Sequence, residues 1–248
     1  MRPVLRSVSI RLAFAPLAAI ATFAACSYTS YTPPSRMMPL ETALAPAPNH
    51  TDLQAEGSMA GAVMGFGTWN GALRLREGLD DNVAVTAEGG VMNVDGHAAA
   101  GTEHNAYMGR IGVHLHQRDR TEGPHVALTA GVGGGWSALA GRWVTQDVAV
   151  IVSGNGAWVV PFASLEGFAS QPIDPQLFQY RTGESSTPRT DVLTRTAGFR
   201  VTAGLEFRDG SGIDSRASFL IGMMMGGIEK PDDGDMFMGL GAALRLSW

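Results

Sequence analysis

The sequence predicts an all-β protein, a ten-stranded antiparallel transmembrane β-barrel, and three observations lead to this prediction. Apolar residues alternate with small or polar ones at a period of two along most of the chain after residue 57, which is typical of strands. Glycine is abundant, with 32 among 248 residues, and charged residues make up only 17%. The body of the chain contains no run of about 20 apolar residues, the length that a membrane-crossing helix needs.

The alternating segments are separated by connections of two kinds. The expected strands are 57–66, 70–78, 82–93, 104–117, 124–134, 144–153, 157–168, 192–208, 213–227 and 236–248. Every second connection is a short turn, such as 79–81 and 154–156, whereas most of the others are longer, such as 169–191. This alternation predicts an even strand number, with both termini in the periplasm, at the turn-bearing end of the barrel. Because the connection 67–69 is also short, eight strands with 57–78 rearranged is the alternative.

Residue parity divides each expected strand into an apolar face and a polar face. We assign the apolar faces to lipid, because the opposite faces combine charges with many glycines, which suits a narrow, hydrated lumen. A soluble barrel would have the reverse arrangement, with its apolar face inside. The charged residues expected to face the lumen are Arg74, Arg76, Glu88, Arg110, Glu166, Arg200, Glu206, Arg216 and Arg245.

Arginines outnumber acidic residues in this lumenal set. A barrel of about ten strands has an interior only slightly wider than side chains can fill, so we expect a salt-bridged plug that stabilises the barrel. An anion-selective pore is the alternative. Pro161 interrupts the seventh strand, and a closed barrel has no edge strand to accommodate a proline. We therefore expect a β-bulge there that turns Ser164 and Glu166 toward the lumen.

The N-terminal 25 residues have the layout of a secretory signal peptide, in which Arg2, Arg6 and Arg11 precede an apolar segment followed by small residues. Removal of residues 1–25 takes away three arginines and no acidic residue, so the formal net charge falls from −5 to −8. This negative charge argues against nucleic acid as a partner.

The sole cysteine, Cys26, follows the run Phe-Ala-Ala directly. This run resembles the lipobox of bacterial lipoproteins, in which a cysteine after two small residues is acylated and becomes the new N-terminus. The resemblance implies a lipid anchor at Cys26, and ordinary cleavage nearby is the alternative. Residues 26–56 are rich in Pro, Ser, Thr and Ala and have no apolar period, so we expect a disordered tether between the anchor and a barrel over 57–248.

The last thirteen residues alternate without interruption and end on Trp248. Leu244, Leu246 and Trp248 share the apolar face of this segment. A C-terminal strand that ends on an aromatic residue resembles the signature of Gram-negative outer-membrane β-barrels, which the barrel-assembly machinery reads. The resemblance implies an outer-membrane location, with membrane lipids and that machinery as partners, and does not indicate a surface ligand.

Three histidines are expected on the lumenal face at the turn-bearing end, namely His114, His116 and His125. If 118–123 is a hairpin turn, His116 would oppose His125, and cross-strand side chains at that spacing could bind zinc or copper. Polar filling of the lumen is the alternative interpretation.

The expected function is non-catalytic, a structural or surface-interaction role with weak solute passage as an accompanying possibility, and no cofactor motif is recognised. One alternative is a hydrolase at the barrel rim that uses Asp95, His97, Glu103 and His104. Another is a soluble ligand-binding barrel tethered by Cys26. The long connection 169–191, with Leu177, is a further candidate for ligand binding.

Overall fold

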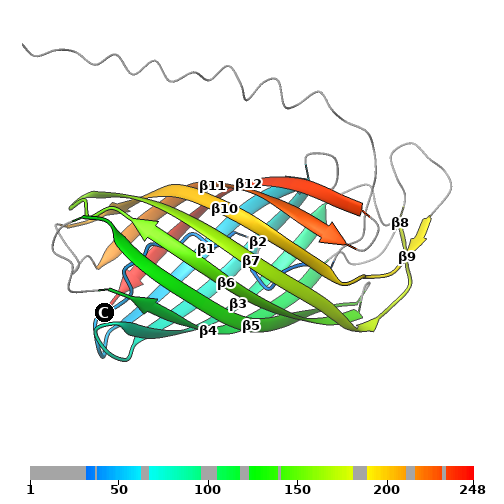
Figure 1. Cartoon of the computed structure of the whole chain (residues 1–248), viewed down its shortest axis with the longest axis horizontal. Helices are drawn as coiled ribbons and strands as arrows, with labels where there is room; N and C mark the ends of the chain where they lie inside the picture. The colour runs from blue at the N-terminus through cyan, green and yellow to red at the C-terminus, as the bar shows by residue number, and fades with distance from the viewer. Residues whose placement is uncertain are drawn as a thin grey trace, which may run out of the picture.

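The computed structural model describes residues 32–36, 38–62, 67–95, 105–117, 123–138, 141–180, 189–210, 216–230 and 233–248. Ten strands close into one antiparallel barrel (Figure 1), which confirms the predicted fold class and overturns the eight-stranded alternative. These strands are β1 (Thr51–Ala62), β2 (Gly67–Gly78), β3 (Val83–Asp95), β4 (Asn105–His116), β5 (His125–Ser137), β6 (Gly141–Ser153), β7 (Val159–Pro175), β10 (Thr196–Arg208), β11 (Ala217–Lys230) and β12 (Asp233–Ser247).

The barrel is closed by pairing between the first strand and the last. β1 pairs with β12 over eleven residue pairs, from Asp52↔Ser247 to Ala62↔Phe237. Next to the pair Asp52↔Ser247, the backbone N–H of Thr51 donates to the carbonyl of Trp248 at 2.9 Å, and the N–H of Trp248 donates to the carbonyl of Thr51 at 3.1 Å. We call the end that holds Thr51 and Trp248 the C-terminal mouth. The opposite end, which carries the connection 176–195, is the loop mouth.

The side chains follow the predicted parity. In β6, for example, buried and exposed residues alternate along all thirteen positions. The outward face is apolar, with large exposed side chains on every strand of the barrel, and the inward face is polar and buried. On β12 the outward residues include Leu244 and Leu246, and Trp248, directly after the strand, is exposed as well, as expected. This arrangement is the reverse of that in a soluble barrel, whose apolar side chains face inward. The barrel thus presents an apolar surface to its surroundings.

The strands differ from expectation mainly at their ends. β1 begins at Thr51, six residues before the expected start, and β7 extends to Pro175. Within the predicted loop 169–191, β8 (Phe178–Tyr180) and β9 (Arg189–Asp191) form a separate two-stranded sheet. Strand extension of this kind leaves 96–104 and 176–195 as the long connections of the loop mouth.

The expected bulge at Pro161 is absent from the described pairing, and the prediction is wrong. Pro161 pairs with Leu205 in an unbroken register between β7 and β10. Its carbonyl accepts a hydrogen bond from Gly154, just beyond the point where the β6 ladder ends at Ser153↔Phe162. Pro161, which has no N–H, therefore lies just past the end of the β6–β7 ladder, so it removes no hydrogen bond from that ladder. The register shift lies instead between Arg142 and Trp143.

The described part of the chain holds no helix with the length and apolar character that a membrane crossing requires.

Candidate functional site

The interior of the barrel is filled by the chain's own N-terminal part. Residues 32–48, which we call the threaded segment, precede β1 and run through the lumen (Figure 1, dark blue). Every described residue from Thr32 to Pro46 is buried. The prediction of a disordered tether over 26–56 is therefore wrong for this part, because these residues pack inside the barrel and residues 51–56 belong to β1.

The threaded segment passes from one mouth to the other. At the loop mouth, the backbone N–H of Thr32 donates to Thr196 Oγ1 at 3.0 Å, where β10 begins. Toward the C-terminal mouth, the N–H of Ala43 donates to Oγ of Ser153, the last residue of β6, at 3.2 Å. Pro48 then forms a parallel bridge with Gly78, the last residue of β2.

Wall side chains satisfy the backbone of the threaded segment. Five prolines in 32–48 favour an extended chain without internal hydrogen bonds, and the backbone groups of the surrounding strands are engaged in the barrel ladders. The segment's carbonyls consequently accept from side chains. Gln54 Nε2 and Arg74 Nη1 donate to the Leu40 carbonyl at 2.8 and 3.2 Å, and Arg200 donates to the Arg36 carbonyl.

A belt of buried ion pairs joins the segment to the wall. Arg36 Nη2 lies 2.7 Å from Glu41 Oε2 within the segment, and Arg36 Nε lies 3.3 Å from Glu88 Oε2 on β3. Glu41 Oε1 lies 3.5 Å from Arg76 Nη1. Further pairs lie within the wall: Arg74 with Glu56 and Glu88, Arg76 with Asp52, Arg110 with Asp147, Arg200 with Glu166, and Arg208 and Arg245 with Glu206.

The ion pairs correct the expected excess of lumenal arginine. The prediction missed Asp52, Glu56 and Asp147, which lie on the inward face and pair with arginines. It also placed Arg216 in the lumen, whereas Arg216 is exposed just before β11. The remaining members of the predicted set are buried in the lumen. The geometry therefore fits the salt-bridged interior rather than an arginine-lined pore.

Inward-facing glycines make room for the segment. A Cβ atom added at Gly222 would lie 2.8 Å from Leu40 Cδ2, and one added at Gly241 would lie 2.8 Å from Met38 Sδ. Near the loop mouth, a Cβ at Gly133 would lie 2.8 Å from the Cβ of Ser35. Met38 and Leu40 are fully buried in a cluster that includes wall residues such as Phe162 and Leu220. The small inward residues thus shape a channel that matches an extended chain.

The three histidines are lumenal as predicted, but their pairing differs. His116 pairs with Ala127 and His125 pairs with Ser153, so the β4–β5 register is displaced by two residues from the expected one. His114 contacts the threaded segment: Nδ1 lies 3.1 Å from Glu41 Oε1 and Nε2 lies 2.9 Å from the Ala43 carbonyl. Within the described residues no group of three or more His, Cys, Asp or Glu side chains could hold a metal ion. The metal interpretation is thus not supported, and His114 is a contact of the segment.

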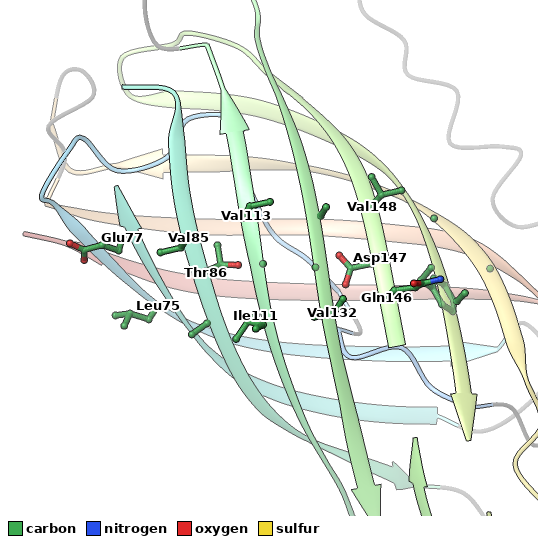
Figure 2. A pocket seen from close by; sticks show the side chains of 18 residues that line it. Leu75, Glu77, Val85, Thr86, Ile111, Val113, Val132, Gln146, Asp147 and Val148 are labelled. Carbon is green, nitrogen blue, oxygen red and sulfur yellow. The ribbon is translucent and has the colours of Figure 1, made fainter. Parts of the chain in front are cut away.

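The outer wall carries a shallow apolar pocket that extends from β2 across β7 to Gly198 on β10 (Figure 2). Its outward lining includes Val85, Ile111 and Val148, while Thr86 and Asp147 belong to the lumenal face of the same strands. This pocket is part of the apolar outer surface. Of the polar residues proposed at the rim, His97, Glu103 and His104 lie outside the described residues, as does Cys26.

Comparison with known proteins gives structural similarity at low sequence identity. No family model and no curated protein matches the sequence. The N-terminal β-barrel domain of OprF from Pseudomonas aeruginosa matches at 12% identity and a TM-score of 0.33, over 81% of this chain and 100% of that one. Neisserial surface protein A matches at 10% and 0.38, over 79% and 95%. LpxR from Salmonella typhimurium matches at 9% and 0.46, over 73% of each chain.

Proposed function

We propose that this protein is a non-catalytic outer-membrane β-barrel whose lumen is closed by its own N-terminal segment, and that it serves a structural or surface-interaction role. The observation that carries this proposal is the threaded segment, in which every described residue from Thr32 to Pro46 is buried inside a barrel with an apolar exterior. Following the resemblance of residues 23–26 to a lipobox, we further propose that Cys26 carries a lipid anchor.

The apolar exterior supports insertion in a bilayer. Residues such as Leu240, Ile111 and Val132 expose 65%, 65% and 57% of their surface, and they belong to a continuous outward-facing set on all ten strands. Exposure of so much apolar surface to water would favour aggregation. In lipid the same surface is compatible, and a closed barrel satisfies its backbone groups without water. These properties disfavour the tethered soluble barrel.

The filled lumen argues against solute passage. Fully buried Met38 and Leu40 occupy its cross-section, and the Arg36 guanidinium pairs with both Glu41 and Glu88. An ion that crossed the barrel would have to displace this segment and leave charged groups without partners, which is costly in a poorly hydrated interior.

Two measurements test the proposal. The full-length protein, extracted from outer membranes, is expected to migrate faster unheated than boiled on a denaturing gel. In planar bilayers it is expected to show no steady conductance, whereas a variant lacking residues 32–44 should conduct. Release of the protein into the soluble fraction without detergent would overturn the membrane assignment, and steady conductance by the intact protein would overturn the closed lumen.

A further inference from the structure

We propose that the barrel displays its own N-terminus on the membrane face opposite the C-terminus, by carrying residues 32–48 through its lumen. This inference rests on the proposed membrane insertion, and it concerns the route of the chain. With the C-terminal mouth in the periplasm, the residues before Thr32 would emerge at the cell surface, and not in the periplasm as the pattern of turns and loops predicted. The barrel would then act as a conduit for one segment of its own chain.

The direction of the threaded segment follows from its two ends. Thr32 contacts Thr194 and Thr196 at the loop mouth. Sixteen residues later, Pro48 bridges to Gly78 at the C-terminal mouth. Asn49, with a φ of 60°, then reverses the chain, and β1 starts back toward the loop mouth from Thr51. Asparagine tolerates this left-handed conformation better than most residues.

Contacts along its length hold the segment in place. Arg36 joins β3 through Glu88, the Leu40 carbonyl accepts from β1 and β2, and Ala43 contacts β4 and β6. These contacts come from strands on several sides of the lumen, so the segment cannot move along the barrel without breaking them together. The chain that leaves the loop mouth is therefore tied to that mouth.

Chain reach determines which leaflet an anchor at Cys26 could enter. Cys26 precedes Thr32 by six residues, and six residues reach at most about 20 Å from that position. The segment from Thr32 to Pro48 already uses sixteen residues to cross the barrel. Acyl chains on Cys26 would accordingly insert into the leaflet at the loop mouth, which is the outer leaflet in the proposed orientation, and not into the periplasmic leaflet.

Disulfide trapping in the refolded barrel tests the route directly. In a Cys26→Ser background, which removes the sole cysteine, the pair Thr32→Cys/Thr196→Cys should crosslink at the loop mouth. The pair Ala43→Cys/Ser153→Cys should crosslink near the C-terminal mouth, because both native pairs are in hydrogen-bond contact. The mismatched pair Ala43→Cys/Thr196→Cys is the control. Equal crosslinking of the matched and mismatched pairs, or none in barrels that remain heat-modifiable, would overturn the threading.

Epitope accessibility in intact cells tests the display. One epitope is inserted after residue 28, a second into the 181–188 connection of the loop mouth, and a third into the 79–82 turn of the C-terminal mouth. The first is expected to be labelled together with the second, while the third is labelled only after the outer membrane is permeabilised. Labelling of the first together with the third would overturn the inference. Labelling of the third alone in intact cells would reverse the proposed orientation and still support passage through the barrel. Absence of all three from the membrane fraction would refute the proposed function instead.

Discussion

Arg36 on the threaded segment and Glu88 on β3 form a buried ion pair, with Nε 3.3 Å from Oε2. The same carboxylate oxygen lies 2.8 Å from Nε of Arg74 on β2, and Arg36 also contacts Glu41. Glu88 thus pairs with one arginine of the wall and with one arginine of the threaded segment. The attachment of the segment depends on charges that come together only in the closed barrel.

Replacement of Arg36 by Met should destabilise the folded barrel strongly. It leaves Glu41 and Glu88 buried with fewer partners, and the loss of one member of a buried ion pair costs about 3–5 kcal/mol. Urea unfolding of the protein in lipid vesicles measures the effect. The control is Arg142→Met, which removes an ion pair to Asp174 whose side chains are 63% and 53% exposed; such pairs contribute about 0–1 kcal/mol. Equal unfolding midpoints for the two variants would contradict the prediction.

Replacement of His114 by Ala should loosen the part of the threaded segment that lies toward the C-terminal mouth. Both ring nitrogens of His114 contact the segment, at Glu41 and at the Ala43 carbonyl, and loss of a buried partner costs about 1–3 kcal/mol. We expect brief channel openings in planar bilayers that the native protein lacks. His125→Ala is the matched control, because His125 is also buried in the lumen but shows no hydrogen bond to the described part of the segment. Openings of equal frequency in both variants would exclude a specific role for His114.

Addition of a side chain at Gly222 should weaken the packing of the threaded segment. A Cβ at Gly222 approaches Leu40 Cδ2 to 2.8 Å and the Ala203 carbonyl to 2.9 Å, so Gly222→Val should cost about 1–3 kcal/mol through overpacking. Gly57 lies on the outward face with no atom within 4 Å of an added Cβ, so Gly57→Val should be neutral or stabilising. The midpoint temperature of the heat-induced gel shift measures both. A larger loss at Gly57 than at Gly222 would disprove the packing argument.

Replacement of Trp248 by Asp should reduce assembly in the outer membrane several-fold. The Trp248 side chain is 62% exposed at the end of the lipid-facing row of β12, and its backbone closes the barrel against Thr51. A charge in this row is unfavourable in a depth-dependent way. Trp248→Phe keeps an aromatic terminus and should assemble normally. The amount of heat-modifiable protein in membrane fractions gives the comparison, and normal levels of the Asp variant would refute the expected role of the terminus.

The ten strands of the barrel, and the face on which nearly every strand side chain lies, could be predicted from residue alternation alone. Val148 and Asp147, for example, separate to opposite faces because neighbouring residues of a strand point in opposite directions. This property is local, so it can be read without knowledge of strand partners. The polar inward face, the inward arginines and the apolar C-terminal row all follow from it.

The filling of the lumen, in contrast, depends on the folded barrel. The segment 32–48 has no periodic pattern, and its burial depends on a channel formed by strands that follow it in the chain. The β4–β5 register could not be predicted from alternation either, because a shift of two residues leaves every side chain on the same face and changes only its cross-strand partner. Alternation specifies faces, whereas the pairing of Arg36 with Glu88, or His114 with Glu41, requires the closed barrel to bring distant residues together.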